Sequence, residues 1–316
     1  MVIRDKASLK RCVKQAVRRA EAVETQLRFD IASGELGVDA ARGVWQSGAE
    51  GTPFSPDAAA MYAALDALDL PTYDLRRAQA EVDSYERGAY LRELLDAMRA
   101  KRVFVRVPLE KAGDAFFGDD RLEPLLCVDG GMFAAGRYGV NYERAAQEIA
   151  DAMHTCGTRE VLAEGVPFDA LRWALLPLCE DEGYRLHTGL CGAQEAERFA
   201  ALMEQFPGVR ALVWADEAGE RALIGAAKEN PRMLVRLGSL QNLAFALETL
   251  GTRLLAYAAC ASQMEIMAGR WITFRERLHP LLAEAYLPLA RAGFELTSEM
   301  IESDVSKLLG GCMYSE

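Results

Sequence analysis

The chain has 316 residues, of which 51% are hydrophobic, enough for one large α/β domain or two ordinary ones. Its 36 Lys and Arg residues stand against 47 Asp and Glu residues, and the net charge of −11 disfavours nucleic acid and anionic membranes as partners. The seven cysteines are odd in number and have no CxxC spacing, so neither a disulfide framework nor a zinc cluster is predicted.

The N-terminal residues show no signal-peptide pattern, because no apolar run follows the first charged residues. No stretch of the chain approaches the roughly 18 to 20 apolar residues that a membrane span needs. We therefore predict a soluble, cytoplasmic protein without membrane contact.

The first hundred residues combine a helix, a strand and an interruption. Residues 7–23 have the apolar stripe of an amphipathic helix, and residues 23–29 alternate as a first strand. Residues 30–101 then carry a glycine-rich loop, a Thr-Pro-Phe-Ser-Pro turn and two predicted helices, at 57–68 and 75–98. No flexible linker bounds this segment, so we interpret residues 30–101 as a helical insertion within one domain.

Strands and helices alternate through the rest of the chain. The predicted strands are residues 103–107, 125–128, 160–162, 184–187, 209–214, 233–237 and 254–258. The predicted helices are residues 142–153, 169–182, 195–205, 220–230 and 243–250. This alternation favours a parallel sheet, and eight strands favour a (β/α)8 TIM barrel over residues 1–316. The alternative is an open doubly wound sheet, but no GxGxxG follows the first strand.

The residues that follow each predicted strand are the candidate functional residues, because barrel active sites lie at the C-terminal ends of the strands. In strand order they include Arg28, Arg106, Asp129, Glu164, His187, Asp216, Arg236 and Cys260. Arginines at such a mouth bind carboxylates or phosphates through a planar fork of donors. We therefore predict that Arg106 and Arg236 bind an anionic substrate. Arg28 either joins them or forms an internal ion pair with one of the carboxylates.

The chain has three histidines, and none has the HxH spacing of a divalent metal site. His154 and His279 fall on predicted helices, where solvated or capping roles are expected. His187 stands at a predicted strand end, where it is either a general base or a hydrogen-bonded core histidine.

Motifs at both ends of the chain carry a family resemblance. They are Glu24 to Phe29, Val44-Trp45 with Thr52-Pro53-Phe54-Ser55, Ala258 to Ser262 ahead of Trp271, Ala292-Gly293-Phe294, and Asp304-Val305 through Gly310-Gly311. Together they resemble the uronate (glucuronate) isomerases of the amidohydrolase superfamily, over roughly residues 8–60 and 245–312. The resemblance implies an amidohydrolase-type barrel, a homo-oligomer and a sugar acid as substrate.

The matched motifs differ from the family at the metal-binding positions. The family's first-strand Asp-Thr-His-Thr-His-Leu is similar to Glu24 to Phe29, which places Gln26 and Arg28 where the family has histidines. The metal-binding aspartate of the family's last strand falls on Cys260. The resemblance thus implies that the divalent metal of the family, such as Zn, has lost its ligands, and we predict no cofactor. We expect Gln26 and Cys260 to contact substrate instead.

Three functions remain open. The first is aldose–ketose isomerisation of a sugar acid without metal, with His187 or Asp216 as base and Arg28 stabilising the oxyanion. The second is a non-catalytic barrel that binds a sugar acid, another anion or a partner protein. The third is a metal-free lyase or hydrolase with Cys260 as nucleophile and His187 as base.

Overall fold

The computed structural model describes residues 3, 5–21, 26–27, 55–86, 88–114, 119–133, 141–258, 260–261 and 264–310. The chain forms two compact units. One, here called the helical unit, comprises Met1–Phe104, Phe117–Leu122 and Ala258–Glu316. The other, here called the sheet unit, comprises Val105–Phe116 and Glu123–Tyr257.

The sheet unit is built on strands that lie side by side in chain order. They are β2 (Val103–Pro108), β3 (Leu122–Asp129), β4 (Glu160–Glu164), β5 (Arg185–Leu190), β6 (Arg210–Ala215), β7 (Met233–Arg236) and β8 (Leu254–Leu255). Every neighbouring pair from β3 to β8 is parallel. Parallel neighbours need long crossover connections, which explains why helices separate most of these strands in the sequence.

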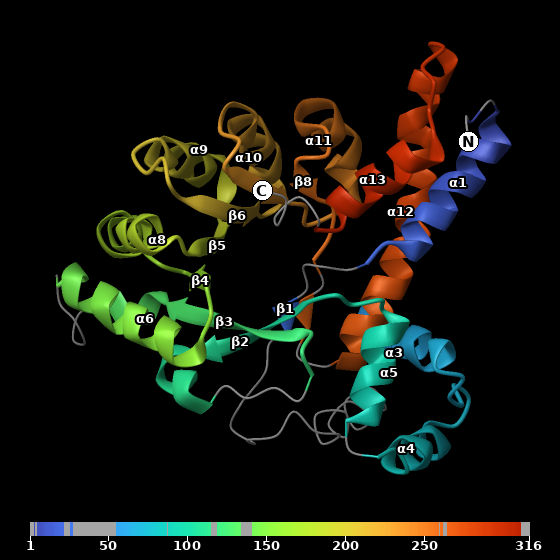
Figure 1. The fold of residues 1–316 in the computed structure, drawn as a ribbon, viewed down its shortest axis with the longest axis horizontal. Coiled ribbons are helices and arrows are strands. Elements are labelled where there is room, and N and C mark those ends of the chain that lie inside the picture. The colour runs from blue at the N-terminus through green and yellow to red at the C-terminus, as the bar shows by residue number, and fades with distance from the viewer. Residues whose placement is uncertain are drawn as a thin grey trace. The chain divides into compact units, whose positions relative to one another are not determined.

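Helices supply most of these crossovers. They are α6 (Tyr142–Cys156), α7 (Phe168–Ala170) continuing through a π-helical turn (Leu171–Leu175) into α8 (Leu176–Glu182), α9 (Gly192–Met203), α10 (Glu217–Glu229) and α11 (Leu243–Leu250). Figure 1 shows α8, α9, α10 and α11 following the row of strands along one side. The π-helical turn precedes Pro177, whose ring cannot share a regular helix with the carbonyl four residues earlier.

The strands of the sheet unit have two unlike faces, because successive side chains point to opposite sides. One face is apolar and buried, as at Val161, Ala163, Val213 and Val235. Helices cover this face: a Cβ placed on Gly219 of α10 would lie 3.1 Å from Cβ of Ala215. The opposite face, here called the polar face, carries the charged residues of β3 to β7.

The helical unit is organised around one long helix, α12 (Met264–Arg291). Its other elements are α1 (Lys6–Arg19), α3 (Pro56–Ala67), α4 (Leu75–Asp83), α5 (Ala89–Ala97), α13 (Ser298–Leu308), and β1 (Gln26–Leu27) paired in parallel with β9 (Cys260–Ala261). Helix α12 packs against α1, α3 and α5. It approaches α3 so closely that a Cβ on Gly269 would lie 1.6 Å from the carbonyl oxygen of Ala60, so only glycine fits there.

A buried guanidinium joins three helices of this unit. Arg275 of α12 is 6% exposed, and its Nη1 donates to the carbonyl oxygens of Val17 at 2.9 Å and Ala20 at 2.7 Å, at the C-terminal end of α1. Its Nη2 donates to the carbonyl oxygen of Met98, which caps α5, at 3.0 Å. Burial, and then the charge of Arg99, lower the pKa of Arg275 to about 10, so it stays charged at neutral pH.

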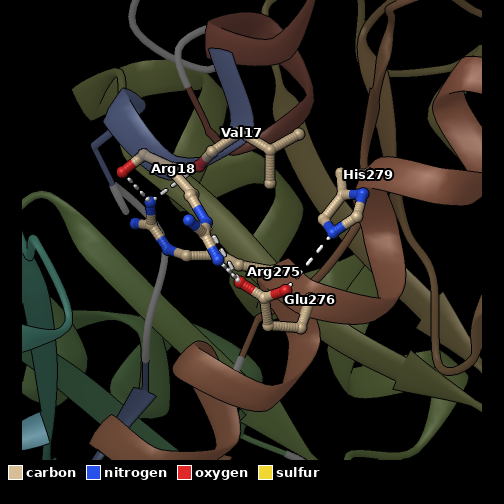
Figure 2. Close-up of polar contacts among 5 residues, drawn as sticks. All are labelled: Val17, Arg18, Arg275, Glu276 and His279. Atoms are coloured by element: carbon tan, nitrogen blue, oxygen red, sulfur yellow. Dashed lines mark hydrogen bonds and ion pairs between the residues drawn. The ribbon is translucent and has the colours of Figure 1, made fainter. Parts of the chain in front are cut away.

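Figure 2 shows Arg275 with Val17 and Arg18 of α1, and a surface ion pair beside them. Arg18 of α1 donates to Glu276 Oε1 at 2.8 Å, and Glu276 Oε2 lies 3.3 Å from His279 Nε2. Helix C-termini carry carbonyls without helical partners, and cations stabilise them. Arg275 therefore ties the end of α1 to α12.

The predicted alternation of strands and helices is confirmed, and with it the α/β class. The boundaries differ in places: the predicted helix over 75–98 is two helices, α4 and α5, separated before Gly88, whose φ of 79° lies in the left-handed region. The predicted first strand lies partly outside the described residues, within which it spans Gln26–Leu27. Closure into a barrel, one domain over residues 1–316 and the helical insertion over 30–101 stay predictions. Within the described ranges, no helix is long and apolar enough to cross a membrane.

We expect Arg275→Met to lower the free energy of unfolding by about 3 kcal/mol, because several buried carbonyls would lose a charged donor. The matched control is Arg277→Met, an exposed position two residues further along α12, which should change stability by less than about 0.5 kcal/mol. Urea denaturation of both variants measures the difference. Equal stabilities would contradict the role given to Arg275.

Candidate functional site

The charged residues at the C-terminal ends of the sheet-unit strands gather on the polar face. Asp129 ends β3 and is the register partner of Glu164, which ends β4. Val213 of β6 pairs with Val235 of β7, so Trp214 and Arg236 lie level one residue further on. The name polar edge is used here for Asp129, Glu164, Trp214 and Arg236 together with Arg106 of β2. Its members come from five different strands of one sheet.

Arg106 and Glu164 form an ion pair within the polar edge. Nη1 of Arg106 lies 3.2 Å from each carboxylate oxygen of Glu164. The side chain of Arg106 is 8% exposed, whereas that of Glu164 is 52% exposed. The pair therefore has a buried cationic end and a carboxylate that solvent or a ligand can reach.

Trp214 and Arg236 form the second pair of the polar edge. The guanidinium carbon of Arg236 lies 3.8 Å from the Trp214 ring centroid, a cation–π contact. Gly189 of β5, the register partner of Trp214, makes room for the indole: a Cβ there would lie 2.6 Å from Trp214 Nε1. The sequence-based prediction included Arg236 but missed Trp214. The sequence signal that could have identified Trp214 was an aromatic residue at the end of the predicted strand that precedes the strand of Arg236.

His187 lies inside its strand and not at its end. The predicted strand stopped at His187, but β5 runs to Leu190, which places the histidine third among six residues. Its ring is fully buried, and Nε2 lies 2.8 Å from Oε2 of Glu160, the first residue of β4. Arg185 forms an ion pair with the same carboxylate. This is the arrangement of the hydrogen-bonded core histidine, the second interpretation of the sequence.

Glu160, which sequence reasoning missed, is the centre of this buried cluster. It is 2% exposed. Burial alone would raise the pKa of Glu160, but the hydrogen bond and charge of His187 and the charge of Arg185 lower it below its usual value. The cluster lies toward the N-terminal ends of β4 and β5, and residues at that end of parallel strands usually serve stability.

Asp216 is engaged as a helix cap. It is the N-cap of α10, and its Oδ1 accepts hydrogen bonds from the backbone N–H of Gly219 at 2.8 Å and of Gly192 at 3.0 Å. The same carboxylate oxygen thus holds the start of α10 and the start of α9. The residue is exposed at the strand end, as predicted, but its observed contacts are to backbone amides.

The remaining predicted residues belong to the first and last strands. Arg28 lies outside the described residues. Gln26 and Cys260 are register partners in the β1–β9 pair, for which the structure describes only the backbone. Their predicted contacts with substrate therefore stay predictions.

The polar edge does not fit the divalent metal that the family resemblance implies. A divalent cation in such a site needs converging imidazole, carboxylate or thiolate ligands. The polar edge offers two carboxylates, Asp129 and Glu164, beside two guanidinium groups, and Arg106 is bound to Glu164. Across the described part of the chain, no three His, Cys, Asp or Glu residues cluster in a way that would hold a metal.

We expect Glu160→Gln to lower the free energy of unfolding by about 3 kcal/mol at pH 7, because it removes the negative charge that faces His187 and Arg185. The pKa of Glu160 is lower in the folded than in the unfolded chain, so its stabilising contribution exists above the unfolded value of about 4.3 and is lost as pH falls through the folded value. The difference between wild type and variant should therefore shrink in acid. Urea titrations across pH measure it, with exposed Glu182→Gln as control. A constant difference below pH 4 would contradict this account.

Comparison with known proteins identifies the fold. No family model and no curated protein matches the sequence. A uronate isomerase structure from Bacillus halodurans matches with a TM-score of 0.80 and 13% identity, over 98% of this chain and 96% of that one. A glucuronate isomerase from Caulobacter crescentus matches with a TM-score of 0.61 and 10% identity, over 97% of this chain and 93% of that one. A uronate isomerase from Thermotoga maritima gives 0.60 and 10%, over 95% of each chain. The resemblance found in the sequence is thus confirmed at the level of structure, and the chain has the fold of the uronate isomerases.

Proposed function

We propose that this protein binds a small sugar acid at the polar edge of its sheet unit. The observation that carries the proposal is the position of the Trp214–Arg236 contact on the same face and edge as the Arg106–Glu164 ion pair. These pairs supply the groups that a polyhydroxy carboxylate needs. The carboxylate group meets guanidinium, the ring meets an aromatic surface, and the hydroxyls meet a carboxylate.

Each group has a distinct part in this binding. A guanidinium binds a carboxylate through two parallel N–H donors, which fixes its orientation as well as its charge. The indole of Trp214 offers an apolar surface with a polar edge, and such rings commonly line small-molecule sites. Glu164, half of whose side chain is exposed, accepts hydrogen bonds from sugar hydroxyls. A neutral sugar would lack the contact to the arginines.

The net charge of the chain sharpens this selectivity. At −11 the protein as a whole repels anions, so an anionic ligand needs a local cation such as the guanidinium of Arg236. The same net charge underlies the proposal that neither nucleic acid nor a membrane is a partner.

We also propose a cytoplasmic homo-oligomer with a closed (β/α)8 barrel and a helical insertion over residues 30–101.

A second candidate function is isomerisation of the bound sugar acid. The similarity to a uronate isomerase across nearly the whole of both chains favours it, although a shared fold does not establish a shared reaction. Moving a proton between C1 and C2 needs a base beside the substrate and a cation near the developing oxyanion. At the polar edge Glu164 would be the base and Arg106 the cation. His187 and Asp216 are held by Glu160 and by backbone amides.

We expect Arg236→Gln to weaken binding of D-glucuronate by at least about tenfold, because it removes a charged hydrogen-bond donor. Binding of D-glucose, measured in parallel, should stay unchanged. Titration of the full chain followed by tryptophan fluorescence measures both. The control is Arg210→Gln, an exposed arginine at the opposite end of the strand that carries Trp214. A wild-type protein that binds the two sugars equally, or binds neither, would overturn the proposed function.

The second candidate predicts conversion of D-glucuronate to D-fructuronate by the wild-type protein, assayed with and without added Zn²⁺ or Mn²⁺. Glu164→Gln should then lower kcat by about 100-fold, since it removes the base but keeps the shape of the side chain. Glu182→Gln is again the control. Turnover that survives in Glu164→Gln would exclude this role for Glu164, and binding without turnover would leave the first function alone.

A further inference from the structure

A second buried carboxylate lies close to the polar edge, in the first turn of α10. Glu220 is 2% exposed. Its Oε1 accepts a hydrogen bond from the backbone N–H of Gly238 at 2.6 Å, and its Oε2 accepts one from the side-chain amide of Asn242. Gly238 belongs to the loop that follows β7, and Asn242 ends the short 3-10 turn (Leu240–Asn242) that completes the connection to α11. One helix residue therefore holds this loop at two points, four residues apart.

This loop begins directly after Arg236. Gly238 stands two residues beyond it, and Leu237 between them donates its N–H to the carbonyl oxygen of Leu255 in the β8 strand at 2.9 Å. The end of β7 is thus fixed by β8 on one side and by Glu220 on the other. The backbone that carries the Arg236 guanidinium has little freedom left.

The same turn of α10 also fixes the partner of Arg236. Trp214 stands two residues before Asp216, the N-cap of α10. Asp216 in turn binds the N–H of Gly192, the first residue of α9, two residues after the end of β5. The loops on both sides of Trp214 are therefore anchored to two carboxylates of one helix start, Asp216 and Glu220. A helix start is a rigid anchor, because its own amides hold the capping carboxylate.

We propose that Glu220 is a positioning residue for Arg236: it holds the loop after β7 so that the guanidinium stays over Trp214 and meets the carboxylate of the ligand. The inference rests on the proposed function for its consequence in binding. It assigns to Glu220 the preference for an acidic over a neutral sugar. Glu220 itself does not touch the ligand.

The test compares Glu220→Gln and Asn242→Ala with wild type, in the full chain. Glu220→Gln leaves one acceptor oxygen where the carboxylate offers two, so Gly238 and Asn242 cannot both be held as before. Asn242→Ala removes the side-chain amide and leaves the buried carboxylate in place should Glu220→Gln fail to fold. For both variants we expect the ratio of D-glucuronate to D-glucose affinity to fall about tenfold, the factor that a hydrogen bond to a charged group is worth. The affinity for D-glucose should be retained. Glu217→Gln, exposed in the same helix turn, is the matched control.

A spectroscopic measurement reads the positioning without any ligand. The emission of Trp214, isolated by subtracting the spectrum of the same protein with Trp214→Phe, should shift in Glu220→Gln toward that of Arg236→Gln. An unchanged Trp214 emission and an unchanged affinity ratio would overturn the positioning role. An equal loss of affinity for both sugars would also overturn it, since a general loss of structure predicts that result. If wild type binds neither sugar but the emission shifts as expected, the proposed function fails and the positioning of Arg236 stands.

Discussion

The alternation of side chains along parallel strands is the constraint on which the sheet unit depends. Each strand must bury one face against helices, and that face is mostly apolar, as Val161, Val213 and Val235 show. Charged residues are thereby restricted to the other face. There they form two groups: Glu160 with His187 and Arg185 near the N-terminal ends, and the polar edge at the C-terminal ends. The first group is buried, and the second includes an exposed carboxylate.

Much of the remaining charge is used to complete helix ends. Asp5, Asp74 and Asp216 accept backbone N–H groups at the starts of α1, α4 and α10. Arg232 and Arg253 donate to carbonyls in and just after the last turns of α9 and α10, as Arg275 does for α1. Buried or strand-end charge in this protein is therefore often structural. The polar edge differs because the carboxylate of its ion pair, Glu164, is half exposed at the ends of the strands.

The sequence allowed the fold class to be predicted because the signals for it are local. Alternating runs of strand and helix residues, and motifs at the two ends of the chain, led to the family whose structures match at only 13% identity or less. The sequence also allowed three polar-edge residues to be predicted, because each lies at or near a predicted strand end: Arg106, Glu164 and Arg236.

The pairing of these residues was not accessible from the sequence. Because β5 ends three residues later than predicted, His187 lies in the core and not at the strand end. Its partner Glu160 is 27 positions away, and nothing near either residue marks the contact. Glu220 resembles any other glutamate on a helix until the loop after β7 is seen to fold over it. The contacts of Trp214 are with Gly189 and Arg236, which both lie on neighbouring strands. Such contacts depend on strand register and on the course of the loops. Neither can be read from the residues next to each partner in the sequence.

The hydrogen bond from Arg275 to Val17 spans 258 positions of the chain. It has a consequence for how the protein is made. The sheet unit is almost continuous in sequence, so its strands and helices leave the ribosome together and can pack as they emerge. Helix α1 emerges first, yet its apolar stripe of Leu9, Val13 and Val17 packs against helices synthesised last. During translation the apolar side of α1 therefore stays without its partner helices α12 and α13 until the whole sheet unit has been synthesised.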